Sequence, residues 1–187
     1  MTDSLHFLKK TLPSTVSERP SPEPDANWSP CCTAAIAIRI ATDGQWFHQG
    51  QPIRRPSLVR LFASILRRED DGEFYLVTPM EKLRIQVDES PFVAVLVDIE
   101  GDVDTTSLRF TLNTGDVVFA GPQHRIWVEQ RDGSPLPLLE VRPGLQARLA
   151  RSVFYQLVER AITLERTEGA VLALRSQGEI FVLGLEH

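Results

Sequence analysis

The sequence predicts an α+β fold in which two related strand-strand-helix-strand-strand units, built on mainly antiparallel sheets, contribute the two principal helices. Three observations lead to this prediction. Most of the chain after residue 28 alternates apolar and polar residues at the period of a β-strand. Two segments instead carry apolar residues at helical spacing. Each of these segments follows a predicted hairpin and precedes two further strands.

Length and composition narrow the class of protein. The chain has 187 residues and is 42% hydrophobic, which is enough to form the core of one domain or two small ones. Its net charge of -5 and its pI near 5.4 argue against nucleic acid, because phosphate binding needs clustered Lys and Arg. No apolar run reaches the roughly 18 residues of a membrane span, and the N-terminus lacks a signal segment. We therefore expect a cytoplasmic protein without nucleic-acid or membrane partners.

The first 27 residues are predicted to form a flexible tail. Prolines alternate there with serines and acidic residues, a composition that buries too little apolar surface to offset the entropy of ordering. A short helix over residues 4–12 that docks on the body or on a partner is the alternative. Residues 28–98 then form the first predicted unit, and residues 99–187 hold the central strands and the second unit.

The first unit begins with a predicted hairpin around Asp43 and Gly44, a pair typical of tight turns. A helix is predicted from Pro56, because apolar residues recur on one face and proline is favourable at the first helical position. The predicted elements are strands over residues 36–40 and 46–53, the helix over residues 56–68, and strands over residues 73–77 and 83–87.

The second half shows the same signals. A continuous apolar run over residues 92–99 predicts a strand that is buried on both faces. Leu145, Leu149, Val153 and Leu157 recur at helical spacing after Pro143, so a second helix is predicted over residues 143–164. The remaining predicted strands cover residues 107–112, 116–120, 125–130, 136–141, 170–174 and 179–183.

The two helical segments indicate an internal duplication. Arg55-Pro56 opens the first segment and Arg142-Pro143 opens the second. Each helix leads to a glycine and two further strands, so the order of elements is repeated. In this alignment of the units, the turn over residues 78–82 corresponds to the turn over residues 175–178.

Several short motifs occur in a fixed order along the chain. They are the run over residues 43–50 (DGQWFHQG), the segments over residues 58–62 (LVRLF) and 76–79 (LVTP), Gly115-Asp116, Gly121 with His124, Val141-Arg142, and Ser176 with Gly178. With these motifs the chain resembles, over about residues 28–183, the bacterial family known as domain of unknown function 1285. The resemblance implies an α+β fold with repeated structural motifs and a signalling role without a known ligand.

Thr78, Glu81 and Lys82 form the strongest polar group, at a predicted hairpin tip. A Glu and a Lys held there could bind a polar ligand or a partner. In the alternative, Pro79 fixes the turn, Glu81 caps backbone groups and Lys82 is solvated.

Asn113, Asp116 and His124 are predicted at neighbouring strand ends, where they could converge with Arg142. A histidine beside an aspartate is suited to proton transfer, as in a hydrolase. One histidine and one carboxylate fall short of a metal set, which needs three or four ligands. The alternative is an Asn-Gly type turn with a hydrogen-bonded histidine.

Two arginines, a histidine and a cysteine are further candidates for chemistry. Arg55 and Arg142, equivalent in the predicted units, could bind one anion across the pseudo-symmetry or could hydrogen-bond carbonyls at strand ends. His48 is predicted to be packed or half-exposed in its strand. The neighbours Cys31 and Cys32 are expected to stay reduced, and Cys32 would be a nucleophile only beside a base that the sequence does not locate.

The leading prediction is a non-enzymatic regulatory or signal-transduction module. It binds a small polar ligand or a protein partner, through Thr78, Glu81, Lys82, Asn113, Arg55 and Arg142. The alternative is a small hydrolase-type enzyme that uses His124 and Asp116. No metal and no cofactor is predicted, and a homo-oligomer or a purely structural assembly role stays open.

Overall fold

The first sheet has six strands in the order β3-β2-β1-β6-β5-β4. A computed structural model describes residues 32–101, 106–166 and 169–185 of the chain. Parallel pairing of β1 with β6 lies at the centre of the sheet, and the other neighbours are antiparallel. Its elements are β1 (Cys32–Ile40), β2 (Trp46–His48), β3 (Gln51–Pro52), α2 (Pro56–Ser64), β4 (Leu66–Arg68), β5 (Phe74–Val77) and β6 (Glu81–Val87).

The second sheet repeats this strand order, with β10-β11-β12-β7-β8-β9 as neighbours and a parallel pair, β7 and β12, at the centre. Its strands are β7 (Phe92–Glu100), β8 (Ser107–Leu112), β9 (Val117–Phe119), β10 (Ile126–Arg131), β11 (Ser134–Arg142) and β12 (Leu145–Leu149). The chain thus contains two similar six-stranded sheets. The repeated unit is a mixed six-stranded sheet, which corrects the prediction of strand-strand-helix-strand-strand units on mainly antiparallel sheets.

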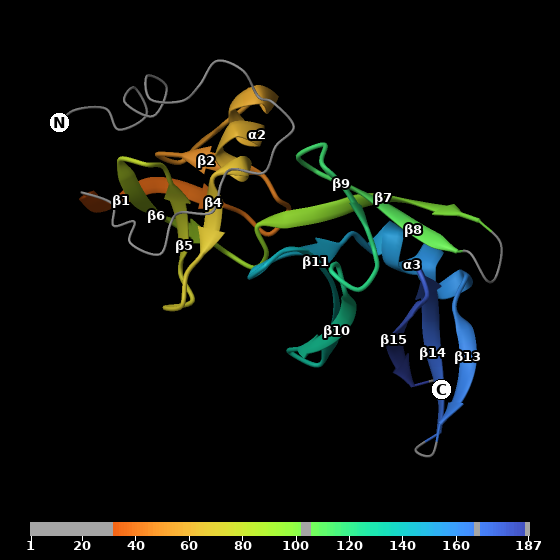
Figure 1. Ribbon diagram of the computed structural model, residues 1–187. Helices are drawn as coiled ribbons and strands as arrows, with labels where there is room; N and C mark the ends of the chain where they lie inside the picture. The colour runs from red at the N-terminus through yellow and green to blue at the C-terminus, as the bar shows by residue number, and fades with distance from the viewer. Residues whose placement is uncertain (1–31, 102–105, 167–168, 186–187) are drawn as a thin grey trace.

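The remaining chain forms α3 (Arg151–Glu159) and an antiparallel three-stranded sheet of β13 (Ile162–Arg166), β14 (Gly169–Ser176) and β15 (Glu179–Leu185). Figure 1 shows the first sheet with α2 at one end of the molecule, the second sheet in the middle and the third sheet at the other end. The predicted tail over residues 1–27 lies outside the described residues.

The duplication changes which residues are equivalent. Arg55 precedes α2, which joins the third strand of the first sheet to the fourth. Arg142 instead ends β11, the fifth strand of its sheet. The turn that begins at Thr78, after β5, therefore corresponds to the Pro143-Gly144 turn after β11. The predicted equivalents at residues 175–178 belong to the third sheet.

The predicted helix over residues 143–164 is wrong in its first part. Residues 145–149 form β12, in which Leu145, Ala147 and Leu149 are buried in alternation. Gly144, at φ 73°, closes the tight turn before that strand. Leu145 and Leu149 are four residues apart, a spacing that fits both a helix and a strand. The segment forms a strand because it pairs with β7 and β11. Only Arg151–Glu159 is helical.

Two boundaries in the first unit also differ from the prediction. The helix ends at Ser64, and Leu66–Arg68 form the strand β4 paired with β5. The predicted strand over residues 46–53 is divided into β2 and β3 by a turn in which Gln49 and Gly50 both have positive φ. Such turns match the twist of a two-stranded hairpin.

A continuous apolar core connects the three sheets and both helices. In the first unit Trp46 stacks on Phe62 of α2, with ring centroids 6.2 Å apart. Each fully buried side chain of this size contributes roughly 1.5–3 kcal/mol. The second sheet, α3 and the third sheet extend this core with Phe92, Phe110, Leu139, Val153, Leu157, Leu174 and Phe181.

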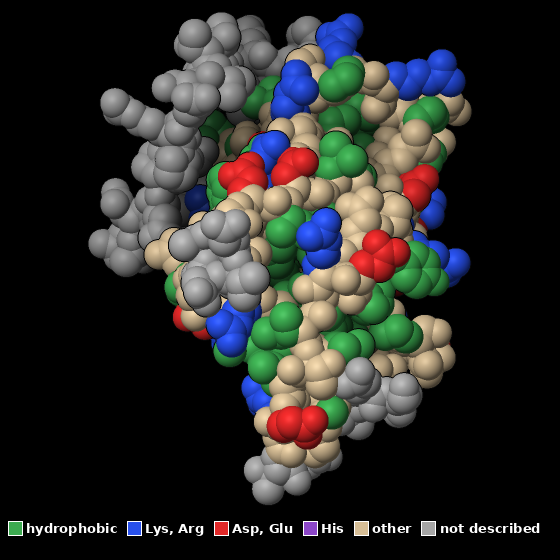
Figure 2. Space-filling view, turned by 90° about the vertical axis from the view of Figure 1, so that its right-hand side faces the viewer, with side chains coloured by type: hydrophobic (Ala, Val, Ile, Leu, Met, Phe, Trp, Pro, Cys, Tyr) green, Lys and Arg blue, Asp and Glu red, His purple; other side chains and the backbone are tan. Residues whose placement is uncertain are grey.

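Charged side chains of both signs are spread over the surface. Figure 2 shows acidic and basic groups interspersed with apolar side chains over one face of the molecule. Arg109, for example, lies 2.7 Å from Asp98 and 3.4 Å from Glu100 across β7 and β8. Among the described residues, no helix has the length and apolar character that crossing a membrane requires.

Asn113 ties the β1–β2 turn to the second sheet. Its Oδ1 accepts from the Val93 N–H at 3.0 Å, and its Nδ2 donates to the Gly44 carbonyl at 2.9 Å. Gly44 has φ 81°, and a Cβ at this position would lie 2.5 Å from Asn113 Nδ2. The turn therefore needs glycine both for its backbone angle and for the close approach of the amide. Arg148 adds a bond from its Nε to the Thr42 carbonyl at 2.8 Å.

Ser176 fixes the third sheet to the second. This fully buried residue donates from Oγ to the Ala120 carbonyl at 2.6 Å and accepts from the Leu108 N–H at 2.9 Å. The adjacent Gln177 N–H donates to the Thr106 carbonyl at 2.9 Å. The β14–β15 turn is thereby held beside the connection that follows β9.

Replacing Asn113 tests the tie between the first two sheets. We expect Asn113→Ala to lower the free energy of unfolding by about 2 kcal/mol, because the Val93 N–H and the Gly44 carbonyl lose their partner. Urea denaturation measures this change. Gln130→Ala removes an exposed amide on β10 and serves as the control, with a change below about 0.5 kcal/mol. Equal changes in the two variants would contradict the role given to Asn113.

Candidate functional site

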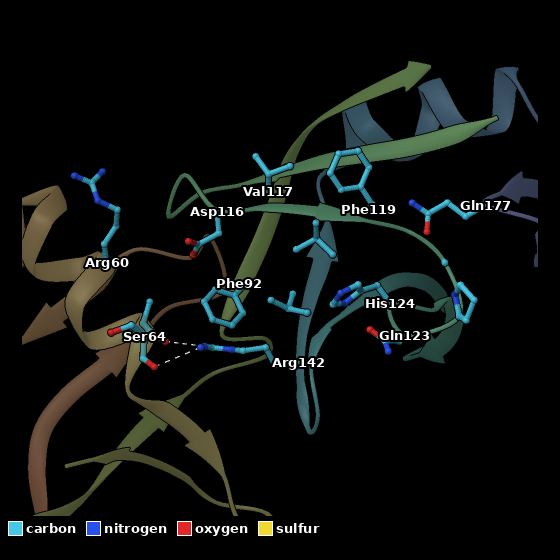
Figure 3. A pocket seen from close by; sticks show the side chains of 15 residues that line it. Arg60, Ser64, Phe92, Asp116, Val117, Phe119, Gln123, His124, Arg142 and Gln177 are labelled. Carbon is cyan, nitrogen blue, oxygen red and sulfur yellow. Dashed lines mark hydrogen bonds between the residues drawn. The ribbon is translucent and has the colours of Figure 1, made fainter. Parts of the chain in front are cut away.

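A cavity of about 570 Å³ lies where α2, β9, β11 and the β14–β15 turn meet (Figure 3), and we call it the junction cavity. Its walls are both apolar and polar, which is typical of sites for small molecules. The lining residues that matter most here are Arg60, Phe92, Asp116, His124, Arg142 and Gln177.

Arg142 is the central polar residue of the junction cavity. Its Nη2 donates to the Ala63 carbonyl at 2.7 Å and its Nη1 to the Ser64 carbonyl at 3.4 Å. These carbonyls lie in the last turn of α2, where the helix supplies no N–H four residues further on, so the guanidinium caps it. The guanidinium also lies 5.7 Å from the centroid of the Phe92 ring. Its Nε is buried and has no hydrogen-bond partner among the described residues. Burial lowers the pKa of Arg142, while the charge of Asp116 acts in the opposite direction.

His124 and Asp116 line the same cavity, but their hydrogen bonds go to other groups. His124 Nδ1 lies 3.1 Å from the Glu140 carbonyl. Because a carbonyl only accepts, Nδ1 carries a proton and Nε2 is the acceptor of the neutral ring. Asp116 Oδ2 accepts from Thr114 Oγ1 at 2.6 Å. The imidazole is therefore oriented by a backbone carbonyl, and Asp116 does not take the part of an orienting carboxylate.

Within residues 32–101, 106–166 and 169–185, no three His, Cys, Asp or Glu residues are grouped so as to hold a metal ion.

Gln177 reaches the junction cavity from the third sheet, and the sequence analysis did not anticipate it. Its backbone adopts φ 49°, which is rare for a residue with a side chain. The side chain lies against Gly121, where any Cβ would collide with Gln177 Oε1. The sequence marks turns at both places, but no local pattern links residues that are 56 positions apart. Arg60 and Phe92 were also missed, because helix and strand periodicity assigned them to a solvated face and to the core.

The predicted group at Thr78, Glu81 and Lys82 lies away from the junction cavity. Thr78 is buried, and its Oγ1 accepts from the Glu81 N–H at 3.0 Å, which closes the β5–β6 turn. Lys82 Nζ lies 2.9 Å from Glu69 Oε2 and 4.3 Å from the centroid of the Tyr75 ring. Glu81 Oε2 is buried without a hydrogen-bond partner among the described residues.

The other predicted residues are dispersed. Both ends of the Asn113 amide are hydrogen-bonded in the contact between the first two sheets. Arg55 is exposed before α2, and its side chain makes no cap hydrogen bond. His48 is half-buried in β2, and the side chain of Cys32 lies outside the description. The structure thus brings together Arg142, Asp116 and His124, and it does not bring Arg55, Asn113 or the Thr78 turn to them.

Two similar mixed sheets beside a cavity with apolar and polar walls, followed by a helix and a small antiparallel sheet, define a duplicated class of α+β protein. The chain belongs to the DUF1285 family, which confirms the resemblance seen in its motifs. Two models of this family of unknown function match the chain. The DUF1285 N-terminal domain matches residues 23–90, and the DUF1285 C-terminal domain matches residues 91–183.

Two solved structures are similar to the chain. A DUF1285 family protein from Silicibacter pomeroyi DSS-3 is 40% identical, with a TM-score of 0.84 over 99% of this chain and 97% of that one. A DUF1285 family protein from Shewanella baltica OS155 is 27% identical, with a TM-score of 0.53 over 66% of this chain and 91% of that one. A search of curated proteins gives no match.

The capping role of Arg142 can be tested by a variant that keeps its charge. We expect Arg142→Lys to lower the free energy of unfolding by about 1–3 kcal/mol, because one ammonium group cannot bond both carbonyls in the same geometry. Arg55→Lys is the matched control and should change stability by less than about 0.5 kcal/mol. Chemical denaturation followed by circular dichroism measures both, and an unaltered Arg142→Lys protein would refute the cap.

The hydrogen bond between Tyr75 and Asp71 makes the stability of the fold depend on pH. The Tyr75 hydroxyl donates to Asp71 Oδ2 at 2.7 Å and lowers the pKa of Asp71, with a smaller contribution from the Glu73 N–H. A carboxyl group whose pKa is lowered in the folded state stabilises the fold at pH values above its ordinary pKa of about 3.9. This stabilisation is lost as the pH falls through the folded-state pKa.

We therefore expect Tyr75→Phe to raise the pKa of Asp71 toward its ordinary value, as measured by NMR titration of the carboxyl carbon. Asp88, whose pKa is lowered mainly by its hydrogen bond with Arg39, provides the reference within the same titration and should not change. An Asp71 pKa that is the same in both proteins would rule out the tyrosine as the main cause.

Proposed function

We propose that the protein is a non-enzymatic regulatory module that binds a small polar ligand, specifically an anion with an apolar part, in the junction cavity. The observation that carries this proposal is the guanidinium of Arg142 at the wall of a 570 Å³ cavity, with a buried Nε that no described residue pairs. A ligand carboxylate or phosphate is the group that satisfies such a donor best.

The walls of the cavity define the rest of the ligand. Val117 and Phe119 are the exposed apolar residues of the lining, and Gln177 contributes an amide from the β14–β15 turn. Asp116 is the only carboxylate among the lining residues, so a second negative charge on the ligand would be repelled near Asp116. A monoanion with a compact apolar or aromatic group fits this distribution of charge.

A regulatory role is supported by the position of the site. The junction cavity is lined by α2 from the first unit, by β9 and β11 from the second, and by Gln177 from the third sheet. A ligand held there contacts three parts of the fold at once, so it would favour one relative arrangement of them. We also propose the cytoplasm as the place where this module acts.

The predicted turn at Thr78 is a weaker location for the ligand. Lys82 already has Glu69 and the Tyr75 ring as partners. The Thr78 hydroxyl is used within the turn. A ligand that binds Lys82 or Thr78 would therefore have to displace existing bonds. Arg142 Nε has no hydrogen bond to a described residue that a ligand would have to displace.

The alternative function is a hydrolase-type activity at the same cavity. One observation favours it, since His124 presents an imidazole whose Nε2 is the acceptor nitrogen. Asp116 is bonded to Thr114 and cannot orient that ring in the observed arrangement. A panel of ester, amide and phosphate substrates, with His124→Ala as the control, tests the activity. We expect no turnover above that control, and turnover lost in the control would favour the enzyme.

Calorimetric titration with phosphate, acetate and benzoate tests the proposed ligand class. We expect benzoate to bind best, since it supplies both a carboxylate and a ring. Asp116→Asn should strengthen binding by about threefold to tenfold, because it removes a nearby like charge. Arg142→Gln should weaken binding by at least about tenfold.

Arg55→Ala, which changes an exposed arginine outside the cavity, should leave the affinity unaltered. Circular dichroism establishes that each variant is folded, which matters most for Arg142→Gln. The proposal fails when the wild-type protein binds none of the three anions. It also fails when the folded Asp116→Asn variant binds them with unaltered affinity.

A further inference from the structure

β9 is an edge strand of the second sheet. On the side away from β8, its backbone N–H and C=O groups pair with no described strand. The Leu112 N–H donates to the Asp116 carbonyl at 2.8 Å, so these two residues form a hydrogen-bonded pair across β8 and β9. Residues on a strand alternate between bonding the neighbour and facing away from it. Val118 therefore bonds β8 as Asp116 does, whereas the N–H and C=O groups of Val117 and Phe119 face away.

This open edge borders the junction cavity. The four successive residues 116–119 all line it, and neighbouring side chains point to opposite faces of a strand, so the cavity touches the edge itself. Figure 3 shows Val117 and Phe119 on one side of β9, and Arg142 and His124 on the other. Val117 is 46% exposed and Phe119 is 40% exposed. An exposed apolar edge strand can pair with a strand of another chain.

We propose that the β9 edge binds an extended peptide segment of a protein partner as an additional β-strand. Val117 and Phe119 each offer one N–H donor and one C=O acceptor, which is the set that strand addition uses. β9 spans only Val117–Phe119, so the edge suits a short linear motif in the partner.

The pleat of the sheet specifies that motif. A peptide residue opposite Val118 points to the same face as Val118, which is the side of β9 on which Arg142 and His124 lie. The cation of Arg142 favours an acidic side chain there. The two flanking peptide residues point with Val117 and Phe119, whose exposed side chains favour apolar partners. The motif is therefore apolar, acidic, apolar.

This inference rests on the proposed function in one respect, because the acidic side chain of the peptide occupies the anion site. A small anion and the partner peptide then exclude each other, and the free ligand controls the binding of the partner. A second copy of the chain, paired edge to edge through β9, is the competing occupant.

Fluorescence polarisation with the full-length chain tests the inference. The probe is a labelled peptide of sequence Thr-Val-Glu-Val-Thr, with blocked ends, and the comparison peptides carry Gln or Lys at the centre. We expect the Glu peptide to bind at least about tenfold more tightly than the Lys peptide. Benzoate should displace the Glu peptide.

Val117→Pro isolates the edge from the cavity. Proline removes the outward N–H and leaves the bonds of β9 to β8 intact, which is why proline is tolerated on edge strands. We expect Val117→Pro to weaken peptide binding by at least about tenfold. Val117→Ala shortens the same side chain but keeps the N–H, so its effect should be smaller. Methylating the amide of the peptide residue that pairs with Val117 gives the same test on wild-type protein.

The two proposals fail separately. Anion binding without binding of the Glu peptide overturns this inference and leaves the proposed function standing. Peptide binding without anion binding supports this inference and overturns the small-ligand function. Equal affinity for the Glu and Lys peptides, or unaltered binding after both Val117→Pro and amide methylation, overturns the inference. So does a β9-mediated dimer that excludes the peptide.

Discussion

One guanidinium, that of Arg142, holds together features that come from distant parts of the chain. It ends β11, caps α2 through the Ala63 and Ser64 carbonyls, and covers the ring of Phe92. The end of the helix, the wall of the cavity and the contact between α2 and the second sheet therefore depend on one side chain. A lysine carries the same charge but lacks the planar fork that allows several directed bonds at once. The geometry of the guanidinium matters here more than its charge.

Much of the architecture can be predicted from local patterns. The hairpin at Gly44, the start of α2 at Pro56 and most strands follow from turn chemistry and periodicity. The second helix was placed too early because Leu145 and Leu149 satisfy two periods at once, and only pairing with neighbouring strands distinguishes them. The duplication was inferred correctly in kind, but its unit was misjudged because helices give a stronger signal than short strands.

The candidate site was predictable only in part. Arg142, Asp116 and His124 were singled out because polar residues at strand ends tend to converge, and they do line one cavity. Gln177 and Phe92 could not be found in this way. The first arrives through a contact between two turns, Gly121 with Gln177, and the second belongs to an apolar run that is otherwise core. The Thr78 turn attracts attention by its charges, but Lys82 is paired with Glu69 and the Thr78 hydroxyl is used within the turn.

The two units differ most in the connection between their third and fourth strands. In the first unit this connection carries α2, whereas in the second it is the short segment over residues 120–125, which lines the junction cavity. The cavity therefore lies where the second unit has a short connection in place of a helix, and a helix inserted between β9 and β10 would fill it.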